Sequence, residues 1–154
     1  MAIEDVFEIR NLLYSYCWLI DSGDFEGVCQ LLKDADISYG GKLTYSRDPE
    51  GYMQTLKPIV RYKDGTTKTV HMCIDPIIEV ASDGLTATAK SYTVVVQGIT
   101  GQMLPQIIWV DRKLDTFEKV EGRWRFASRD FITRAEGDTA RHIDMGVFTR
   151  KKKK

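Results

Sequence analysis

The sequence predicts an α+β fold in which N-terminal helices pack in a strongly curved, mainly antiparallel sheet. Two observations carry this prediction. Apolar residues recur at helical spacing over residues 3–21, with no glycine or proline among them. From residue 67 onward the pattern changes to long runs rich in threonine and valine, separated by short glycine turns. A long bent sheet wrapped around one helix makes a cone-shaped α+β barrel with a cavity at its open end.

Residues 3–21 and 24–33 are predicted to form a helical hairpin. Gly23 can end the first helix because glycine takes the left-handed conformation at little steric cost. Asp24 then stands where it can cap the second helix. The apolar set on residues 3–21 is broad, so we expect this helix to be largely buried. A third helix is expected to open at Asp48-Pro49, with the aspartate as cap and the proline in the first turn.

The strand pattern begins with residues 35–39, which alternate in polarity, turn at Gly40-Gly41 and return over residues 42–45. Long strands are expected over residues 67–80, 86–99, 105–120 and 123–133. Pro76 lies within the first of these, so that strand should be at an edge or contain a bulge. Four apolar residues of the polar tail after Gly137 could pack back on the body as a lid, or contact a neighbour: Ile143, Met145, Val147 and Phe148.

Length and charge favour a single domain over residues 1–150, followed by a disordered lysine tail at 151–154. The formal net charge is zero, with 22 basic and 22 acidic residues. Without the four terminal lysines, 18 basic residues remain and the body carries a charge of −4. We therefore expect no nucleic-acid partner.

Other classes of protein are also disfavoured. No apolar run approaches the roughly 20 residues of a membrane span, and the acidic N-terminus is unlike a signal peptide. The three cysteines are an odd number in apolar segments, typical of reduced thiols in a cytoplasmic protein. CxxC, HExxH, P-loop and GxGxxG motifs are all lacking, so we expect neither a metal nor an organic cofactor.

Asp21 is the first candidate catalytic residue. It falls in the last turn of its predicted helix, where the backbone dipole opposes a negative charge. An acid at this position does not stabilise the helix, which suggests that it has another role. Helical spacing places it on one face with Tyr14, Cys17 and Trp18. A carboxylate in this position is either a paired structural acid or a catalytic one.

His71 is the strongest candidate partner for Asp21. Strand alternation places it on one face with Thr69 and Cys73. A histidine hydrogen-bonded to a carboxylate is an effective general base, because the acid fixes the tautomer and stabilises the imidazolium. The two residues are 50 positions apart, so the pattern also allows a helix-terminal acid and a strand histidine without chemical roles.

Seven further side chains are candidates for binding substrate: Tyr14, Trp18, Tyr39, Tyr45, Cys73, Trp109 and Arg129. The tyrosines could donate a hydrogen bond to a leaving group, although such residues are more often core or rim residues. The tryptophans are candidate pocket walls. Arg129 could hold a leaving halide, a carboxylate or an enolate oxygen. The alternative for Arg129 is a cross-strand pair with an aspartate.

The order and spacing of several segments resemble a SnoaL-like domain of the nuclear transport factor 2-like superfamily. These segments are Ile9-Arg10-Asn11-Leu12-Leu13, Asp21-Ser22-Gly23-Asp24, Thr69-Val70-His71-Met72, Val120-Glu121-Gly122-Arg123-Trp124-Arg125-Phe126 and the stretch from Gly137-Asp138 to Arg141-His142. The resemblance spans roughly residues 3–143 and implies the cone-shaped barrel, commonly as homodimers or homotrimers.

Within that superfamily, scytalone dehydratase and hexachlorocyclohexane dehydrochlorinase use an Asp–His dyad to remove a proton during elimination. Asp21 matches the aspartate that closes the first helix, and His71 matches the histidine on the first long strand. The chain departs from scytalone dehydratase in two ways: Ile20 precedes the aspartate, and the only other histidine is His142, in the tail, which matches no catalytic role.

The resemblance and the ionisable pair together favour a lyase or isomerase, of the dehydratase or dehydrohalogenase kind, acting on a small apolar substrate that is possibly cyclic. Two alternatives stay open: a non-catalytic small-molecule-binding module, and the small structural subunit of a ring-hydroxylating dioxygenase. Fold alone does not decide among these reactions.

Overall fold

Residues 3–146 are the part of the chain that this computed structural model describes, and their helices and strands follow the predicted order. The elements are α1 (Ile3–Asp21), α2 (Phe25–Leu31), β1 (Asp36–Tyr39), β2 (Lys42–Ser46), α3 (Pro49–Leu56), β3 (Thr69–Val80), β4 (Thr86–Ile99), β5 (Met103–Val120) and β6 (Arg123–Glu136). The predicted lysine tail at 151–154, together with Val147 and Phe148, lies outside the described residues.

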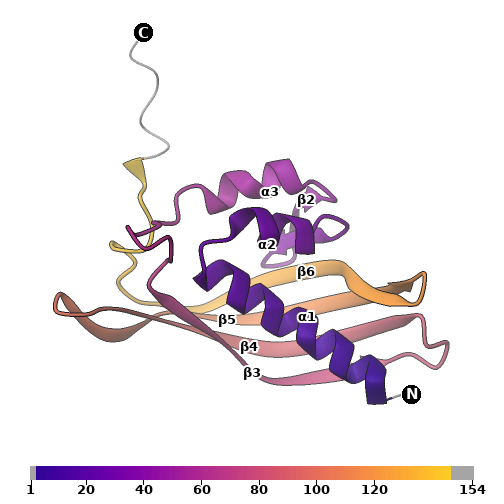
Figure 1. Ribbon diagram of the computed structural model, residues 1–154. Helices are drawn as coiled ribbons and strands as arrows, with labels where there is room; N and C mark the ends of the chain where they lie inside the picture. The colour runs from indigo at the N-terminus through magenta and orange to yellow at the C-terminus, as the bar shows by residue number, and fades with distance from the viewer. Residues whose placement is uncertain (1–2, 147–154) are drawn as a thin grey trace, which may run out of the picture.

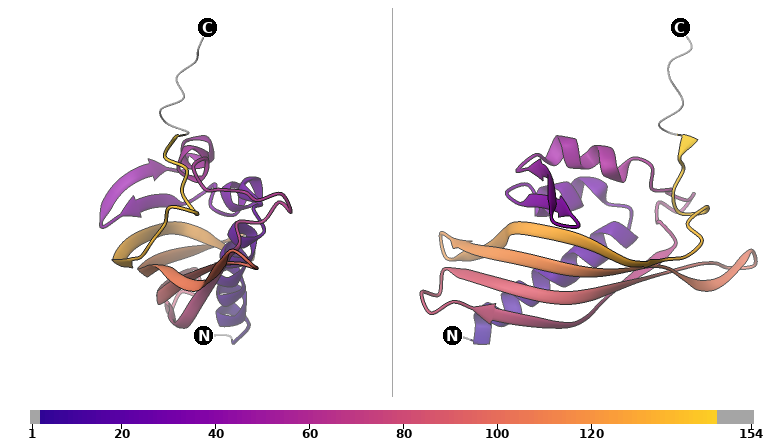
Figure 2. Two further views of the ribbon diagram at one scale, coloured as in Figure 1. Left: turned by 90° about the vertical axis from the view of Figure 1, so that its left-hand side faces the viewer. Right: turned by 180° about the vertical axis from the view of Figure 1, so that it is seen from behind.

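The strands form one six-stranded sheet in the order β2-β1-β6-β5-β4-β3. Every neighbouring pair is antiparallel except β1 and β6, which are parallel. All three helices lie on the same side of this sheet, and α1 runs across it (Figure 1). The views in Figure 2 show its curvature. The predicted α+β class with a curved, mainly antiparallel sheet is confirmed. The sheet is open, because β2 and β3 are its two edges.

The proline in β3 has the predicted consequence. β3 is an edge strand, and its register with β4 shifts between Ile74 and Ile77, around Asp75-Pro76. An edge position suits proline because it has no N–H to donate to a neighbouring strand.

The core lies between α1 and the concave side of the sheet. The buried side of α1 includes Ile9, Leu13 and Ile20, which join a cluster with Phe117 and Phe126 of the sheet. The prediction that α1 is largely buried was too broad. Its opposite side exposes four large apolar residues: Ile3, Phe7, Tyr14 and Trp18.

The ends of the helices follow their predicted caps. Gly23 has a φ of 72°, and its N–H donates to the Ile20 carbonyl over 3.1 Å, while the Asp24 N–H donates to the Leu19 carbonyl over 3.0 Å. These two hydrogen bonds form the Schellman motif, which requires a residue in the left-handed conformation such as Gly23. The carboxylates of Asp24 and Asp48 cap α2 and α3 by accepting backbone N–H groups over 2.8 Å.

Residues 137–146 return from β6 to the segment that follows α3. The Val60 N–H donates to the His142 carbonyl over 2.8 Å, and the Asp144 N–H donates to the Pro58 carbonyl over 2.7 Å. An isolated bridge joins Ile59 to Ile143. The expected packing of the tail on the body is therefore seen through Ile143. Among the helices of residues 3–146, none is both long and apolar enough to cross a bilayer.

Candidate functional site

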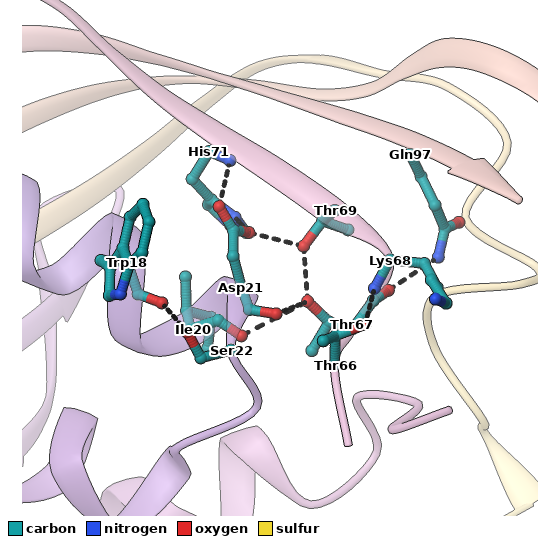
Figure 3. Close-up of polar contacts among 10 residues, drawn as sticks. All are labelled: Trp18, Ile20, Asp21, Ser22, Thr66, Thr67, Lys68, Thr69, His71 and Gln97. Carbon is teal, nitrogen blue, oxygen red and sulfur yellow. Dashed lines mark hydrogen bonds and ion pairs between the residues drawn. The ribbon is translucent and has the colours of Figure 1, made fainter. Parts of the chain in front are cut away.

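Asp21 and His71 are in direct contact where the end of α1 meets the start of β3 (Figure 3). One carboxylate oxygen of Asp21, Oδ1, lies 2.6 Å from Nδ1 of the His71 ring. The other, Oδ2, accepts the backbone N–H of His71 over 2.7 Å. A single carboxylate therefore holds both the ring and the main chain of His71.

Two threonines complete the support of Asp21. The Thr69 hydroxyl donates to Asp21 Oδ1 over 2.6 Å, and the Thr67 hydroxyl lies 2.6 Å from that of Thr69. Thr67 also contacts the end of α1: its N–H donates to the Asp21 carbonyl over 3.2 Å. Carbonyls in the last turn of a helix have no partner within the helix. Thr67 supplies one, and thereby ties the segment that leads into β3 to the helix end that carries the acid.

This network assigns the protonation of the pair. Asp21 accepts hydrogen bonds from the Thr69 hydroxyl and the His71 N–H, and its contact with His71 Nδ1 takes its direction from the tautomer. An ionised carboxylate only accepts hydrogen bonds. Nδ1 of a neutral His71 must then carry the proton, and Nε2 is left with a free lone pair. The side chains of His71 and Asp21 are 10% and 21% exposed, so the pair is shielded and still reachable. Such a histidine is equipped to accept a proton.

The pair opens on a cleft of about 540 Å³ at the seam between α1 and β3. Its lining combines apolar and aromatic side chains with a few polar ones, as small-molecule sites do. The lining residues are Tyr14, Cys17, Trp18, Asp21, Ser22, Thr66, Thr69, Val70, His71 and Cys73.

A larger hollow of about 710 Å³ lies beside the turn between β4 and β5 and shares Thr69 and Val70 with the cleft, but neither Asp21 nor His71 is among the described residues that line it. Lys68 is the one titratable side chain among the described residues that line it. The smaller cleft combines an acid with a base, so we place the candidate site there.

The predicted substrate-binding residues divide into two groups. Tyr14, Trp18 and Cys73 line the cleft, with Trp18 at its rim and 78% exposed. The other four are not among the described residues that line it.

Those four residues pack elsewhere in the molecule. Tyr39 stacks on Phe131 at 5.2 Å between ring centroids, and the Tyr45 hydroxyl lies 2.9 Å from that of Thr55. Trp109 donates to the Thr133 hydroxyl over 3.2 Å. Arg129 forms the cross-strand pair that was its alternative, with Asp115.

Sequence reasoning gave no role to His142, which the structure places near the dyad. His142 is buried, and within the described chain its Nδ1 has no hydrogen-bond partner. Burial, with a smaller contribution from the nearby His71, lowers its pKa to about 4, while Asp21 opposes the shift. No local pattern marks this residue, because only the return of the tail across residues 58–60 brings it here.

The cleft thiols remain protonated near neutral pH. Burial raises the pKa of Cys17 to about 11 and also raises the pKa of Cys73. A thiol in this state is a poor nucleophile, so His71 is the stronger proton acceptor of the cleft. Within residues 3–146, no group of three or more histidine, cysteine or acidic side chains is arranged to hold a metal ion.

Comparison with known proteins places this geometry in a family. The sequence profile described as the SnoaL-like domain matches residues 1–130. No curated protein sequence matches the chain. An NTF2-like protein with a cystatin-like fold from Novosphingobium aromaticivorans is similar in structure, with 26% identity, a TM-score of 0.68, and coverage of 90% of this chain and 88% of that one.

Two further solved structures share the fold at lower identity. A candidate scytalone dehydratase from Novosphingobium aromaticivorans has 21% identity and a TM-score of 0.68, with 88% of each chain covered. The hexachlorocyclohexane dehydrochlorinase LinA-type3 from Novosphingobium barchaimii has 14% identity and a TM-score of 0.65, with 88% of this chain and 90% of that chain covered.

Proposed function

Because the chain belongs to the SnoaL-like domain family of the NTF2-like superfamily, we propose that it is a cofactor-independent lyase or isomerase acting on a small, apolar, cyclic substrate. The observation that carries the proposal is the hydrogen-bonded Asp21–His71 pair at the wall of an apolar cleft. The names of the dehydratase and dehydrochlorinase neighbours support the same class of reaction. The three cysteines, all free thiols, accord with the cytoplasmic location that we also propose.

In the proposed reaction, Nε2 of His71 removes a proton from a carbon of the substrate. The electron pair of that C–H bond forms a new double bond, and a leaving group departs from the neighbouring carbon with its own electron pair. In an isomerisation, the electrons move instead onto a conjugated carbonyl oxygen, and the proton held by His71 then returns to a different carbon of this enolate as the carbonyl re-forms. Asp21 is the positioning residue, since its carboxylate stabilises the imidazolium that forms.

The developing negative charge on the substrate needs a hydrogen-bond donor. Tyr14 is the tyrosine that lines the cleft, and its hydroxyl is our candidate for that donor. Trp18 and Val70 supply apolar surface on either side of the opening and bind the ring of the substrate.

Deuterium exchange tests the proposal without requiring the natural substrate. 2-Tetralone is an apolar bicyclic ketone with acidic α-protons, and NMR follows their replacement in D₂O. We expect the protein to accelerate this exchange, and His71→Gln to slow it by at least about 100-fold, the usual contribution of a general base. Asp21→Asn should also slow exchange, because it disturbs the tautomer of His71.

Asp83→Asn, in the turn after β3, is the control for Asp21→Asn, since an asparagine retains the turn contacts of Asp83. Undiminished exchange by the His71→Gln protein would show that His71 is not the base. Tight binding of 2-tetralone by the unmodified protein with no exchange would instead favour the non-catalytic binding module.

A further inference from the structure

The side chain of Gln97 joins two segments that are distant in sequence. Gln97 lies in β4 and its exposed fraction is 0%. Its Nε2 donates to the Thr67 carbonyl, a contact drawn in Figure 3, and to the Arg141 carbonyl, over 3.3 Å in each case. Both partners only accept hydrogen bonds, so the nitrogen of the amide must face them. Gln97 therefore connects residues 137–146, here named the return segment, to the turn that leads into β3.

The Thr67 hydroxyl begins a chain of hydrogen bonds that ends at Asp21. The Thr69 hydroxyl has one proton and donates it to Asp21 Oδ1 over 2.6 Å. The Thr67 hydroxyl lies 2.6 Å from that of Thr69 and must therefore be the donor of their contact. Hydrogen bonds in such a chain polarise and strengthen one another. The position of Thr67 thus affects the carboxylate oxygen that faces Nδ1 of His71.

The turn between the two threonines is strained. Lys68 has a positive φ of 57°, which is unfavourable for a residue with a Cβ. In a regular strand, side chains two residues apart are separated by about 6.6 Å. The left-handed Lys68 bends the chain and brings the hydroxyls of Thr67 and Thr69 together. Strain of this kind persists only where the surroundings hold it, and β4 does so through Gln97 and through the Gly98 N–H, which donates to the Lys68 carbonyl over 3.3 Å.

The return segment takes part in this support. Arg141 is held from a second side by Tyr62, whose hydroxyl donates to the Arg141 carbonyl over 2.7 Å. The carbonyl that Gln97 contacts is therefore itself fixed in place. Docking of the return segment orients the Gln97 amide toward Thr67.

We propose that Gln97 is a positioning residue for the Asp21–His71 pair, and that it makes the geometry of the pair depend on the docked return segment. The inference rests on the proposed function of the cleft. Gln97 is not among the described residues that line the cleft. It acts through the two threonines and does not touch the substrate.

Amide hydrogen exchange of the full chain, followed by NMR, tests the inference without substrate. The His71 N–H donates to Asp21 Oδ2, so its exchange reports opening of the pair. The Trp124 N–H is the internal reference, because it donates over 3.0 Å to Glu8, another acid of α1. Gln97→Met removes the donor and keeps the length of the side chain. It should accelerate exchange of the His71 amide about fivefold, the effect of one hydrogen bond, and change that of Trp124 by less than about twofold.

Catalysis provides a second measurement. Gln97→Met should lower kcat for deuterium exchange of 2-tetralone about fivefold per folded molecule, with KM unchanged because Gln97 does not line the cleft. Gln106→Met is the matched control. Gln106 lies opposite Gln97 on β5, and its amide contacts the sulfur of Met103 instead. This variant should leave kcat and the exchange of both amides unchanged.

Gln97→Asn serves if Gln97→Met does not fold. It keeps a buried amide on a side chain about 1.5 Å shorter, so contacts that already span 3.3 Å are lost, and the His71 amide should again exchange faster than in the unmodified protein. Unchanged exchange of the His71 amide in the folded variant overturns the inference. Equal acceleration of the His71 and Trp124 amides also overturns it, because Gln97 would then stabilise only the fold as a whole. Absence of 2-tetralone exchange by the unmodified protein counts against the proposed function alone, since amide exchange needs no turnover.

Discussion

The Asp21 carboxylate binds His71 twice, accepting the main-chain N–H on Oδ2 over 2.7 Å and contacting ring Nδ1 through Oδ1 at 2.6 Å. One residue of helix α1 thus holds both the main chain and the ring of a residue in strand β3 (Figure 3). Rotation of the ring away from the cleft would break its contact with Oδ1, whereas Oδ2 keeps the carboxylate bound to the main chain of His71. Preorganisation of this kind is what a proton acceptor needs.

The Thr69 hydroxyl should matter for activity through Asp21. Thr69→Val keeps the shape of the side chain but removes the donor to Asp21 Oδ1. We expect exchange of 2-tetralone to slow by about tenfold, the effect of one hydrogen bond to a charged group, and the pH midpoint of the rate to move. Thr69→Ser restores the hydroxyl and should recover most of the rate. Equal rates and pH profiles for all three proteins would remove Thr69 from the positioning of the site.

Two glycines offer a matched test of the helix end that carries Asp21. Gly23 and Gly65 both have positive φ angles, 72° and 86°. A Cβ at Gly23 would overlap the Gly65 carbonyl oxygen, whereas a Cβ at Gly65 would meet open space. Gly65→Ala should cost about 1 to 2 kcal/mol of unfolding free energy from its backbone conformation alone. Gly23→Ala should cost about 1 to 3 kcal/mol more, from the overlap. Urea denaturation measures both, and equal costs would contradict the close approach.

His142 should make stability depend on pH. Its folded-state pKa is about 4, below the ordinary value of 6.5, because burial and His71 disfavour the charged ring. Between pH 6.5 and 4 the unfolded chain therefore binds a proton that the folded protein does not, and the free energy of unfolding falls as pH is lowered. The loss attributable to His142 is about 3 kcal/mol over that window.

Urea denaturation at pH 7, 5.5 and 4 checks this prediction. His142→Gln cannot take up the proton, so the variant should lose less stability on acidification than the unmodified protein. Identical pH dependence in the two proteins would mean that His142 titrates normally.

The Asp111–Lys113 pair should be non-additive in stability. Lys113→Met alone leaves the buried Asp111 charge without its partner, so it should cost about 3 to 5 kcal/mol at pH 7. Asp111→Leu/Lys113→Met removes both charges and should be neutral, or stabilising by about 1 to 4 kcal/mol. Lys90→Met, at an exposed position, should change stability by less than about 0.5 kcal/mol. A double variant as unstable as Lys113→Met would show that the pair is not a coupled unit.

Local features of the sequence were enough to predict most of the fold. Some features depend only on backbone geometry within a few residues, so the sequence is enough to predict them. They are the helix end at Gly23, the caps at Asp24 and Asp48 and the bulge at Pro76. The extent of burial of α1 could not be read in this way. Trp18 is a large apolar side chain of the kind that packs in cores, yet it is 78% exposed.

The same distinction between local and long-range features applies to the candidate site. The residues that could act are recognisable along the chain, because a carboxylate in the last turn of a helix and a histidine on an alternating strand are local features. Which groups meet depends on the folded chain, which brings Asp21 to His71, Arg129 to Asp115, and His142 near the dyad. Hydrogen bonds between side chains extend only about 3 Å, whereas these partners are separated by many residues along the chain. Their proximity therefore depends on how the curved sheet and the returning tail pack around α1.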